Sequence, residues 1–484
     1  MTIKTPDWVK NAVFYQIFPD RFAKSQPTVK GQWLASKLEG WDATPSLQGY
    51  KGGNLWGVID KLDYLQDLGI NAIYFTPIFQ SASNHRYHTH DYYQVDPLLG
   101  GNVAFEALIE AAHKKDIKVV LDGVFNHASR GFFFFNDILE NGPHSPWLDW
   151  FKIHGWPLSA YDGSKPANYE SWVNNRALPQ FNHDNPQVKE YIMQVAEYWL
   201  YKGIDGWRLD VPNEVTTPGF WQEFRDRVKG VNPEAYIVGE IWCDASHWLD
   251  GTQFDGVMNY RFTEPTVAFT AGDRYVREYG QQNLEPYPPI SASQYAAKME
   301  NLLSLYDWEI QLTQLNLLDS HDTSRLITAV GEDKSSFMLA SVLLFTFPGA
   351  PSIYYGDEVG LPGGKDPDCR RVFPASPSWD IEILKSYKQL IALRHQYPAL
   401  CTGKYATLYA EGSIYVFARI LNDSAIIVAV NTDTNSQTVS FPVTKLESQP
   451  DKLLYGEGRV NWHHLAEANQ LEITIPPRSS LIVG

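Results

Sequence analysis

The chain has 484 residues, of which 44% are hydrophobic and 20% charged, a composition typical of a folded globular protein and not of a disordered one. The chain is too long to fold around one ordinary hydrophobic core, and its length fits a large barrel with insertions joined to a smaller domain. The formal net charge of -16 argues against nucleic acid or an anionic membrane surface as a partner.

The cysteines and the N-terminal segment bear on the cellular compartment. Cys243, Cys369 and Cys401 lie far apart without CxxC spacing, so a disulfide framework and a thiolate zinc site are both disfavoured. The first residues lack a basic region followed by a long apolar one, and no run of about 18 uncharged apolar residues occurs. We therefore expect a cytoplasmic protein without a membrane span.

Taken in chain order, short apolar strands alternate with helical segments. One helix is predicted to end at Gly69, another to begin at its cap Asn102, and a third to run over 186–201 behind the cap Asn185. The predicted strands cover residues 12–19, 70–77, 118–127, 204–211, 235–240, 254–260, 312–322 and 350–358. Eight such units predict an α/β protein built on a parallel (β/α)8 TIM barrel.

Two segments depart from this alternation. Residues 128–181 are rich in Gly, Pro, Asn and aromatics and are too long for a structureless loop, so we expect an inserted subdomain after the third strand. The run "GFFFFND", residues 131–137, is either a sugar-binding wall or the small core of this subdomain, and we favour the core. Short alternating strands predict a C-terminal antiparallel β-sandwich over 398–484. The two parts of the barrel then occupy 1–127 and 182–397.

The predicted strand within "GIDGWRLDVPNE" carries two charges on one face. Side chains of a strand alternate, so Trp207 and Leu209 share one face while Arg208 and Asp210 share the other. A carboxylate at the mouth of a barrel tends to protonate when it is desolvated, and an arginine beside it holds it ionised and oriented. An ionised, oriented carboxylate is what a covalent nucleophile requires.

Other predicted strands also end in polar residues, at the rim where barrel enzymes carry their chemistry. Asn126 and His127 follow the third strand, Glu240 ends the fifth, and His321 and Asp322 end the seventh. A second carboxyl with a raised pKa would act as general acid beside the nucleophile. Two such carboxyls facing each other are the layout of a retaining glycosidase.

In its ordered motifs the chain resembles the α-amylase family of glycoside hydrolases over nearly its whole length. The blocks that carry the resemblance are "DGVFNH", "GWRLDVPNE", "GEIW" and "LLDSHD", with "KGGNLWGV" and "HRYHTHDYYQVDP" beside them. The blocks "VPNE", "GKDPDCRR" and "SHDTSRL" are most similar to the neopullulanase, cyclomaltodextrinase and maltogenic amylase branch. The resemblance implies a retaining hydrolase that cleaves α-1,6 branch points, α-1,4 bonds or both in maltooligosaccharides, glycogen-type glucans or pullulan.

The resemblance also implies roles for individual residues. Asp210 is the nucleophile, Glu240 the general acid/base, and Asp322 the carboxylate that holds the sugar at the cleavage site. Tyr87 is the stacking platform beneath that sugar, and Asp122 is expected to be structural, tying together the loop after the third strand. Substrate-binding roles are implied for Tyr87, His127, Arg208, Asn213, Glu214, His321, Asp368 and Arg371.

Some features of the chain differ from that branch or stay open. The first barrel strand begins close to the N-terminus, so we expect the branch's additional N-terminal β-domain to be absent, and monomer or homodimer stays open. In "LPQFN" Phe181 replaces the usual leucine. Asp368 and Arg371 are expected to clamp the next sugar, although Arg370 is adjacent. The reaction needs no cofactor, and a structural calcium ion with Asn126 among its ligands stays open.

Three other functions compete with this interpretation. An α-1,4-glucanotransferase uses the same covalent intermediate, with a sugar hydroxyl in place of water. A metal-dependent barrel hydrolase is suggested by His85, His88 and His90, although the acids and histidines already have glycosidase roles. A catalytically inactive glucan-binding module would have lost acids of the triad, and this chain keeps all three.

Overall fold

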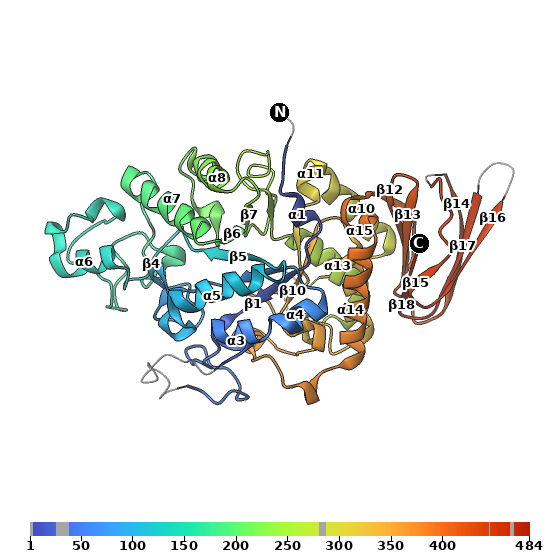
Figure 1. The fold of residues 1–484 in the computed structure, drawn as a ribbon, viewed down its shortest axis with the longest axis horizontal. Helices are drawn as coiled ribbons and strands as arrows, with labels where there is room; N and C mark the ends of the chain where they lie inside the picture. Colours follow the sequence, from blue (N-terminus) through green and yellow to red (C-terminus); the bar gives the residue numbers. More distant parts are fainter. Residues whose placement is uncertain (1–2, 26–37, 280–286, 445, 465–468) are drawn as a thin grey trace.

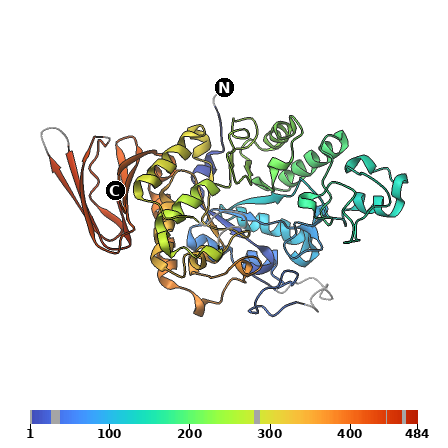
Figure 2. The same cartoon turned by 180° about the vertical axis from the view of Figure 1, so that it is seen from behind.

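The computed structural model describes residues 3–25, 38–279, 287–444, 446–464 and 469–484. Figure 1 shows three regions along the long axis of the molecule. The C-terminal strands lie at one end, the central sheet lies in the middle, and helix α6 (Phe133–Asn141) lies at the opposite end. Figure 2 shows the same arrangement from behind. No helix within these described ranges is long and apolar enough to cross a membrane.

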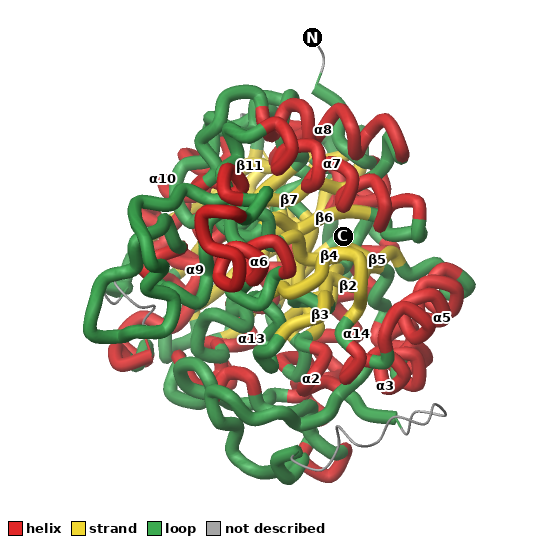
Figure 3. The backbone as a smooth tube through the Cα atoms, turned by 90° about the vertical axis from the view of Figure 1, so that its left-hand side faces the viewer, coloured by secondary structure: helices red, strands yellow, loops and turns green. Residues whose placement is uncertain are grey.

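Eight parallel strands form the central sheet, and in Figure 3 they lie at the centre of the view with helices around them. They are β1 (Phe14–Ile17), β2 (Ala72–Phe75), β5 (Lys118–Gly123), β6 (Gly206–Leu209), β7 (Tyr236–Gly239), β8 (Gly256–Val257), β9 (Leu315–Asn316) and β10 (Ala350–Tyr354). The sheet runs from β8 to β9, and a parallel bridge between Met258 and Leu315 joins these two ends into a barrel. Each strand lies within a predicted one, so the TIM-barrel fold class is confirmed.

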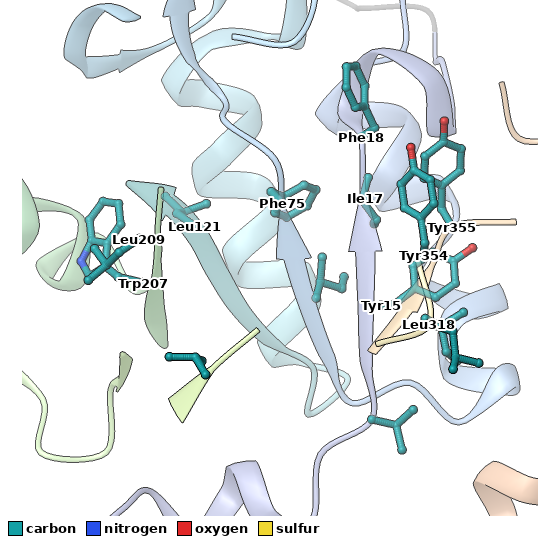
Figure 4. Close-up of a cluster of buried hydrophobic side chains, with 14 of the residues drawn as sticks. Tyr15, Ile17, Phe18, Phe75, Leu121, Trp207, Leu209, Leu318, Tyr354 and Tyr355 are labelled. Atoms are coloured by element: carbon teal, nitrogen blue, oxygen red, sulfur yellow. The ribbon is translucent and has the colours of Figure 1, made fainter. Parts of the chain in front are cut away.

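The barrel strands are buried on both faces, as parallel strands covered by helices must be. The outward face packs against the helices, and Figure 4 shows part of it, with Tyr15, Phe75, Leu121 and Trp207 from four neighbouring strands. The inward face forms a separate cluster that includes Phe14, Tyr74, Val120, Tyr236 and Leu315. Arg208 alternates with Trp207 along β6 and therefore belongs to the inward face, as predicted.

Besides α6, the α-helices of the described residues are α1 (Asp7–Lys10), α2 (Pro19–Phe22), α3 (Leu55–Asp60), α4 (Leu62–Leu68), α5 (Gly101–His113), α7 (Pro186–Tyr201), α8 (Phe220–Val231), α9 (Tyr260–Ala271), α10 (Ala292–Ser304), α11 (Trp308–Gln311), α12 (Leu326–Ala329), α13 (Lys334–Thr346), α14 (Ile381–Gln396) and α15 (Pro398–Thr402). Gly69 ends α4 with a φ of 94°, and the Asn185 side chain caps α7, both as predicted. The predicted cap Asn102 is wrong. It lies inside α5, and its side chain bonds the backbone of Val95 and Tyr93 instead.

The loops above the barrel carry little regular structure. After β2 the chain forms the antiparallel pair β3 (Phe79–Ser81) and β4 (Thr89–Val95). Residues 128–181 contain α6 and isolated bridges, such as the one between Phe151 and Phe181. Phe132 and Phe135 are fully buried there, whereas Phe133 is 66% exposed. The run of four phenylalanines therefore supplies this segment's core, as expected, with one ring turned to solvent.

The C-terminal strands form two antiparallel sheets that face each other. The strands are β11 (Lys404–Glu411), β12 (Ile414–Leu421), β13 (Ser424–Asn431), β14 (Gln437–Val443), β15 (Leu453–Gly456), β16 (Arg459–His464), β17 (Asn469–Ile475) and β18 (Ser479–Val483). The larger sheet has the order β11-β12-β13-β18-β15 and the smaller β14-β17-β16. Val416, Ile427, Phe441 and Ile473 belong to the single apolar cluster between them, so the predicted sandwich is confirmed.

Candidate active site

A cavity of about 1010 Å³ opens where the barrel strands end. β6 leads into Asp210, β7 into Glu240, and the turn after β9 carries Asp322. The residues that line the cavity are Leu47, Gln48, Ala82, Ser83, Asn84, His85, Tyr87, His88, His127, Trp172, Asn175, Leu178, Asp210, Val211, Glu240, Trp242, Asp322, Asp366 and Arg370. The structure thus brings the three predicted acids together with two further predicted residues, Tyr87 and His127.

Arg208 lies beneath the cavity floor and contacts three carboxyl groups. Its Nη1 donates to Asp122 at 3.0 and 3.1 Å and to Oδ1 of Asp210 at 3.0 Å. Its Nη2 lies 2.9 Å from Oε2 of Glu240, a charge contact without the geometry of a hydrogen bond. The side chain is completely buried, so its positive charge acts on these acids with little screening by water.

The two acids that line the cavity beside Arg208 have raised pKa values. Burial is the largest cause for both Asp210 and Glu240, and the Glu240 charge raises the pKa of Asp210 further. The hydrogen bond from Arg208 to Asp210 favours the ionised form of Asp210. The charge of Arg208 acts on Glu240 in the same direction, but without a hydrogen bond.

The residue after the nucleophile candidate adopts an unusual backbone conformation. Val211 has φ 37° and ψ 49°, the left-handed region, although it is β-branched and precedes Pro212. Its amide donates to Oε2 of Glu240 at 3.2 Å. The strained backbone therefore connects the end of β6 directly to the second carboxyl, and such strain is retained at sites where it holds functional groups.

Glu240 has one further donor. Nε1 of Trp242 lies 3.2 Å from Oε1 of Glu240. The indole stacks on the Tyr260 ring, with centroids 3.5 Å apart and planes within 8°. Together with Val211, Trp242 occupies both carboxyl oxygens of Glu240 and fixes its orientation toward the cavity.

Asp122 is buried at the centre of a hydrogen-bond network, which fits the expected structural role, although its side-chain partners lie outside the loop after β5. Its Oδ2 accepts from the Tyr87 hydroxyl at 2.9 Å and from the Tyr74 hydroxyl at 3.2 Å, besides the two contacts from Arg208. The Tyr87 hydroxyl also lies 2.6 Å from Nε2 of His321, and these two rings are parallel within 6°. His321 is fully buried, and its ring contacts the cavity-lining residues Tyr87 and Asp322.

His127 lines the cavity with its ring stacked on Trp172, at a centroid distance of 5.2 Å. Burial lowers the pKa of His127 to about 3, so the ring is neutral at physiological pH. Its Nε2 is buried without a hydrogen-bond partner among the described residues. A neutral ring nitrogen without a described partner, on a residue that lines the cavity, is suited to a hydrogen bond with a sugar hydroxyl.

The residues near Asn126 do not fit a calcium ion. Oδ1 of Asn126 accepts from Nε2 of Gln180 at 3.0 Å, and its Nδ2 faces Nδ1 of His127. Ca²⁺ requires six to eight oxygen ligands, whereas here the amide oxygen is already bonded to a protein donor. Across the described part of the chain, no group of three or more His, Cys, Asp or Glu is arranged to hold a metal, the run with His85 and His88 included.

The two residues expected to clamp a sugar, Asp368 and Arg371, do not line the cavity. They form a bidentate ion pair of 2.8 and 2.9 Å with each other. Arg370 lines the cavity instead. It contacts Asp322 at 3.3 Å and Asp366 at 3.0 Å, and its Nε donates to the His321 carbonyl.

Asn213 and Glu214 also lie outside the lining, in a short 3₁₀ turn over Pro212–Glu214. Glu214 is exposed, and Nδ2 of Asn213 lies 3.5 Å from its Oε1.

The comparisons with known proteins agree with this geometry. The chain matches the model "Alpha amylase, catalytic domain" over residues 16–377 and the model "Alpha-amylase C-terminal domain" over residues 403–483. The chain therefore belongs to the α-amylase family of glycoside hydrolases.

Three relatives narrow this assignment. Neopullulanase 2 of Thermoactinomyces vulgaris is 40% identical over 99% of this chain and 78% of its own length. The crystal structure of the debranching enzyme of Nostoc punctiforme is 64% identical over the full length of both chains, with a TM-score of 0.94. The cyclic α-maltosyl-(1→6)-maltose hydrolase of Arthrobacter globiformis, solved with that sugar, is 34% identical over 99% of this chain and 100% of its own, with a TM-score of 0.86. Within the family, the chain is a glycoside hydrolase of the neopullulanase and debranching type.

Sequence reasoning missed several residues that line the cavity or contact the residues behind its wall. Trp242 follows Glu240 by two positions in the "GEIW" block, and this adjacency could have identified it. Trp172 and Asn175 lie in the segment that was assigned as an insertion without individual roles. Gln16 on β1 contacts His321 at 2.8 Å, and no signal in the sequence connects these two residues.

Proposed function

We propose that the protein is a retaining hydrolase of α-glucans in which Asp210 is the nucleophile and Glu240 the general acid/base. The observation that carries this proposal is that one buried guanidinium, that of Arg208, contacts both carboxyls where they border a single cavity. Retaining glycosidases require this combination of an ionised and a protonated carboxyl in mutual proximity.

The first half of the reaction requires an ionised Asp210 and a protonated Glu240, which is the state that we propose for the free enzyme. Glu240 protonates the glycosidic oxygen while Asp210 attacks the anomeric carbon, and the product is a β-glucosyl ester on Asp210. Trp242 and the Val211 amide hold Glu240 in the orientation needed for the proton transfer. Asp322, held by Arg370, lies at the same cavity and binds hydroxyls of the distorted sugar.

In the second half, the ionised Glu240 removes a proton from water, and the water attacks the glucosyl ester from the face that the leaving group vacated. The product therefore keeps the α configuration. A sugar hydroxyl in place of water gives the transglycosylation reaction, and the same residues serve both. No step in this cycle requires a metal ion, and we propose that the enzyme works without one.

We propose long or branched maltooligosaccharides as the preferred substrates, with α-1,6 branch points accepted. The cavity is large and has an apolar and aromatic wall in Leu47, Trp172 and Trp242, which suits several sugar rings at once. Contacts with remote sugars help orient the reacting bond, so kcat/KM is expected to rise with chain length. A related structure of the Nostoc enzyme is described as acarbose-soaked, and a Bacillus subtilis relative is named an intracellular maltogenic amylase. We place this protein in the cytoplasm on the same basis.

Product analysis tests the proposal. Maltoheptaose, pullulan, β-cyclodextrin and a branched dextrin are each digested, and the anomeric form of the first product is followed by proton NMR. The α-anomer and increasing kcat/KM with chain length are expected. Initial release of the β-anomer would contradict a retaining mechanism, and β-cyclodextrin as the best substrate would contradict the preference for long chains. Products longer than the substrate would identify the glucanotransferase alternative.

A further inference from the structure

His321 lies just behind the cavity wall, and both nitrogens of its ring have partners. Nδ1 lies 2.8 Å from Nε2 of Gln16, and Nε2 lies 2.6 Å from the Tyr87 hydroxyl. Gln16 extends inward from β1, where its backbone pairs with both neighbouring strands, and its side chain is 2% exposed. None of the roles described so far uses this residue.

The tautomer of His321 follows from counting hydrogens. The Tyr87 hydroxyl has one hydrogen and donates it to Oδ2 of Asp122 at 2.9 Å. Asp122 also accepts from Arg208, as expected of an ionised carboxylate. The Tyr87 oxygen must then accept from His321, so Nε2 of the imidazole carries the hydrogen. Nδ1 is left with a lone pair, and the amide group of Gln16 donates to it.

We propose that Gln16 is a positioning residue of the active site, because its amide holds His321 as the neutral Nε2–H tautomer. His321 in turn fixes the Tyr87 hydroxyl at 2.6 Å and lies 3.1 Å from Oδ2 of Asp322. This inference rests on the cavity roles proposed for Tyr87 and Asp322. Gln16 itself touches no substrate and acts only through the ring.

The surroundings of the ring favour the neutral form. The charged and titratable groups that face it are Arg208, Arg370, Asp322, His85 and Tyr87. Burial first, and then the two arginines, lower the pKa of His321 well below its usual value. Gln16 is an uncharged donor, so it fixes the tautomer without raising that pKa. A carboxylate at residue 16 would do the opposite, since it accepts a hydrogen and attracts a positive charge.

The kinetic test compares Gln16→Met with a matched control. Methionine has nearly the same shape but no amide donor, so kcat should fall about tenfold with little change in KM, the effect of losing one buried hydrogen bond. The control is Gln311→Met, which removes another buried amide. That amide donates to the Leu302 carbonyl, and Gln311 does not line the cavity. The kcat of each variant is corrected for the fraction of protein that is folded at the assay temperature. Equal losses in both variants would overturn the proposal, because they would show a merely structural effect.

The pH profile of Gln16→Glu gives a readout that a structural role would not produce. The new carboxylate raises the pKa of His321, and the neutral ring then carries its hydrogen on Nδ1 instead of Nε2. Below the raised pKa the imidazolium still donates from Nε2, and above it that donation is lost. The variant should therefore show an additional decrease in kcat as pH rises, which the wild type lacks. An unchanged profile would overturn the proposal.

The tautomer itself is measured in the wild-type enzyme, independently of catalysis. Histidine is labelled with ¹⁵N, and the ring signals of His321 are assigned by their disappearance in His321→Gln. The Nε2–H pattern is expected in the wild type, with loss of that preference in Gln16→Met. An Nδ1–H pattern in the wild type would overturn the inference even if the hydrolase function stands. Confirmation of the pattern in an enzyme that fails the product analysis would instead overturn the proposed function alone.

Discussion

Arg208 and Arg325 are both buried beside carboxyl groups at the same end of the barrel, but of the two only Arg208 contacts carboxyls that line the cavity. Arg208 contacts Asp122, Asp210 and Glu240, and the last two line the cavity. Arg325, also completely buried, donates from Nη1 to Asp357 at 2.9 Å.

The second cluster shares most electrostatic features with the first. Asp319 and Asp357 are an interacting pair, and burial raises the pKa of both. The rings of Tyr354 and Tyr355 cover the Arg325 guanidinium, with centroids 4.1 and 4.8 Å away. None of these five residues lines the cavity. A buried arginine with perturbed acids therefore does not by itself identify an active site; access of a substrate to the acids does.

The largest expected effect separates the acids of the two clusters. Asp210→Asn should lower kcat at least ~10³-fold with little change in melting temperature, because the swap is nearly isosteric and removes the nucleophile. The matched variant Asp357→Asn also neutralises a carboxyl bonded to a buried arginine, and it should keep kcat within about tenfold of the wild type. Rates on a branched dextrin and melting curves check both. Substantial activity in Asp210→Asn would refute its assignment.

Arg325, whose carboxyl partners do not line the cavity, should matter mainly for the stability of the fold. Arg325→Met leaves two buried carboxyls without their cation, and removal of one partner of a buried pair costs about 3–5 kcal/mol of unfolding free energy. Urea denaturation measures this loss. The folded variant should retain far more activity than Asp210→Asn, and an equal loss of kcat in the two variants would erase the distinction between the clusters.

The loop between the two clusters gives a finer comparison. Arg325 Nε donates to the Cys369 carbonyl, and the next residue, Arg370, contacts Asp322 at the cavity. Arg370→Met should lower kcat/KM by about 10–100-fold, as expected when a hydrogen bond to a charged group is lost. Arg371→Met, which breaks only the ion pair with Asp368, should change kcat/KM by less than about threefold. The reverse order would restore the clamp expected from the sequence.

A smaller effect concerns the pH dependence of catalysis, which depends on the pKa of the cavity-lining acid Glu240. The Trp242 indole donates to Glu240 and so lowers the pKa of that carboxyl, which burial raises overall. In Trp242→Phe this pKa rises further, so the acid stays protonated to higher pH. The alkaline limb of the kcat/KM profile should therefore shift to higher pH. Trp172→Phe, altered at the ring that stacks on His127, is the control and should leave the limb in place. A downward shift in Trp242→Phe would contradict the role of Glu240 as the acid.

The smallest expected effect is that of chelation. EDTA should leave kcat unchanged, because the proton of Glu240 and the carboxylate of Asp210 carry out the reaction. Activity is measured before and after dialysis against the chelator. Complete loss that zinc alone restores would favour the metal-dependent hydrolase.

The sequence predicted what depends on local periodicity and failed where distant segments meet. The eight strands were predictable because each is a short apolar run, and strand alternation alone placed Arg208 and Asp210 on the inward face. The choice between Arg370 and Arg371 was not predictable, since the 3₁₀ turn over Asp368–Arg370 decides which side chain faces the cavity.

Contacts across the barrel were equally hidden from sequence patterns. The bond between Gln16 and His321 joins residues from β1 and from the turn after β9, and only closure of the barrel brings them together. Asn102 failed as a cap for a local reason. Its side chain accepts from the backbone of Val95, seven residues earlier at the end of β4, and Gly100, with φ 104°, is the N-cap of the helix instead.

The conformation of Val211 bears on how this enzyme can evolve. A left-handed residue with a side chain costs about 1–2 kcal/mol, and glycine would avoid that cost. Glycine loses about 0.5–1 kcal/mol through its greater freedom in the unfolded chain, so the strain outweighs that loss. Stability alone therefore favours glycine at position 211, by up to about 1.5 kcal/mol. A valine that persists at this codon in descendants of the gene would record selection on turnover and not on stability.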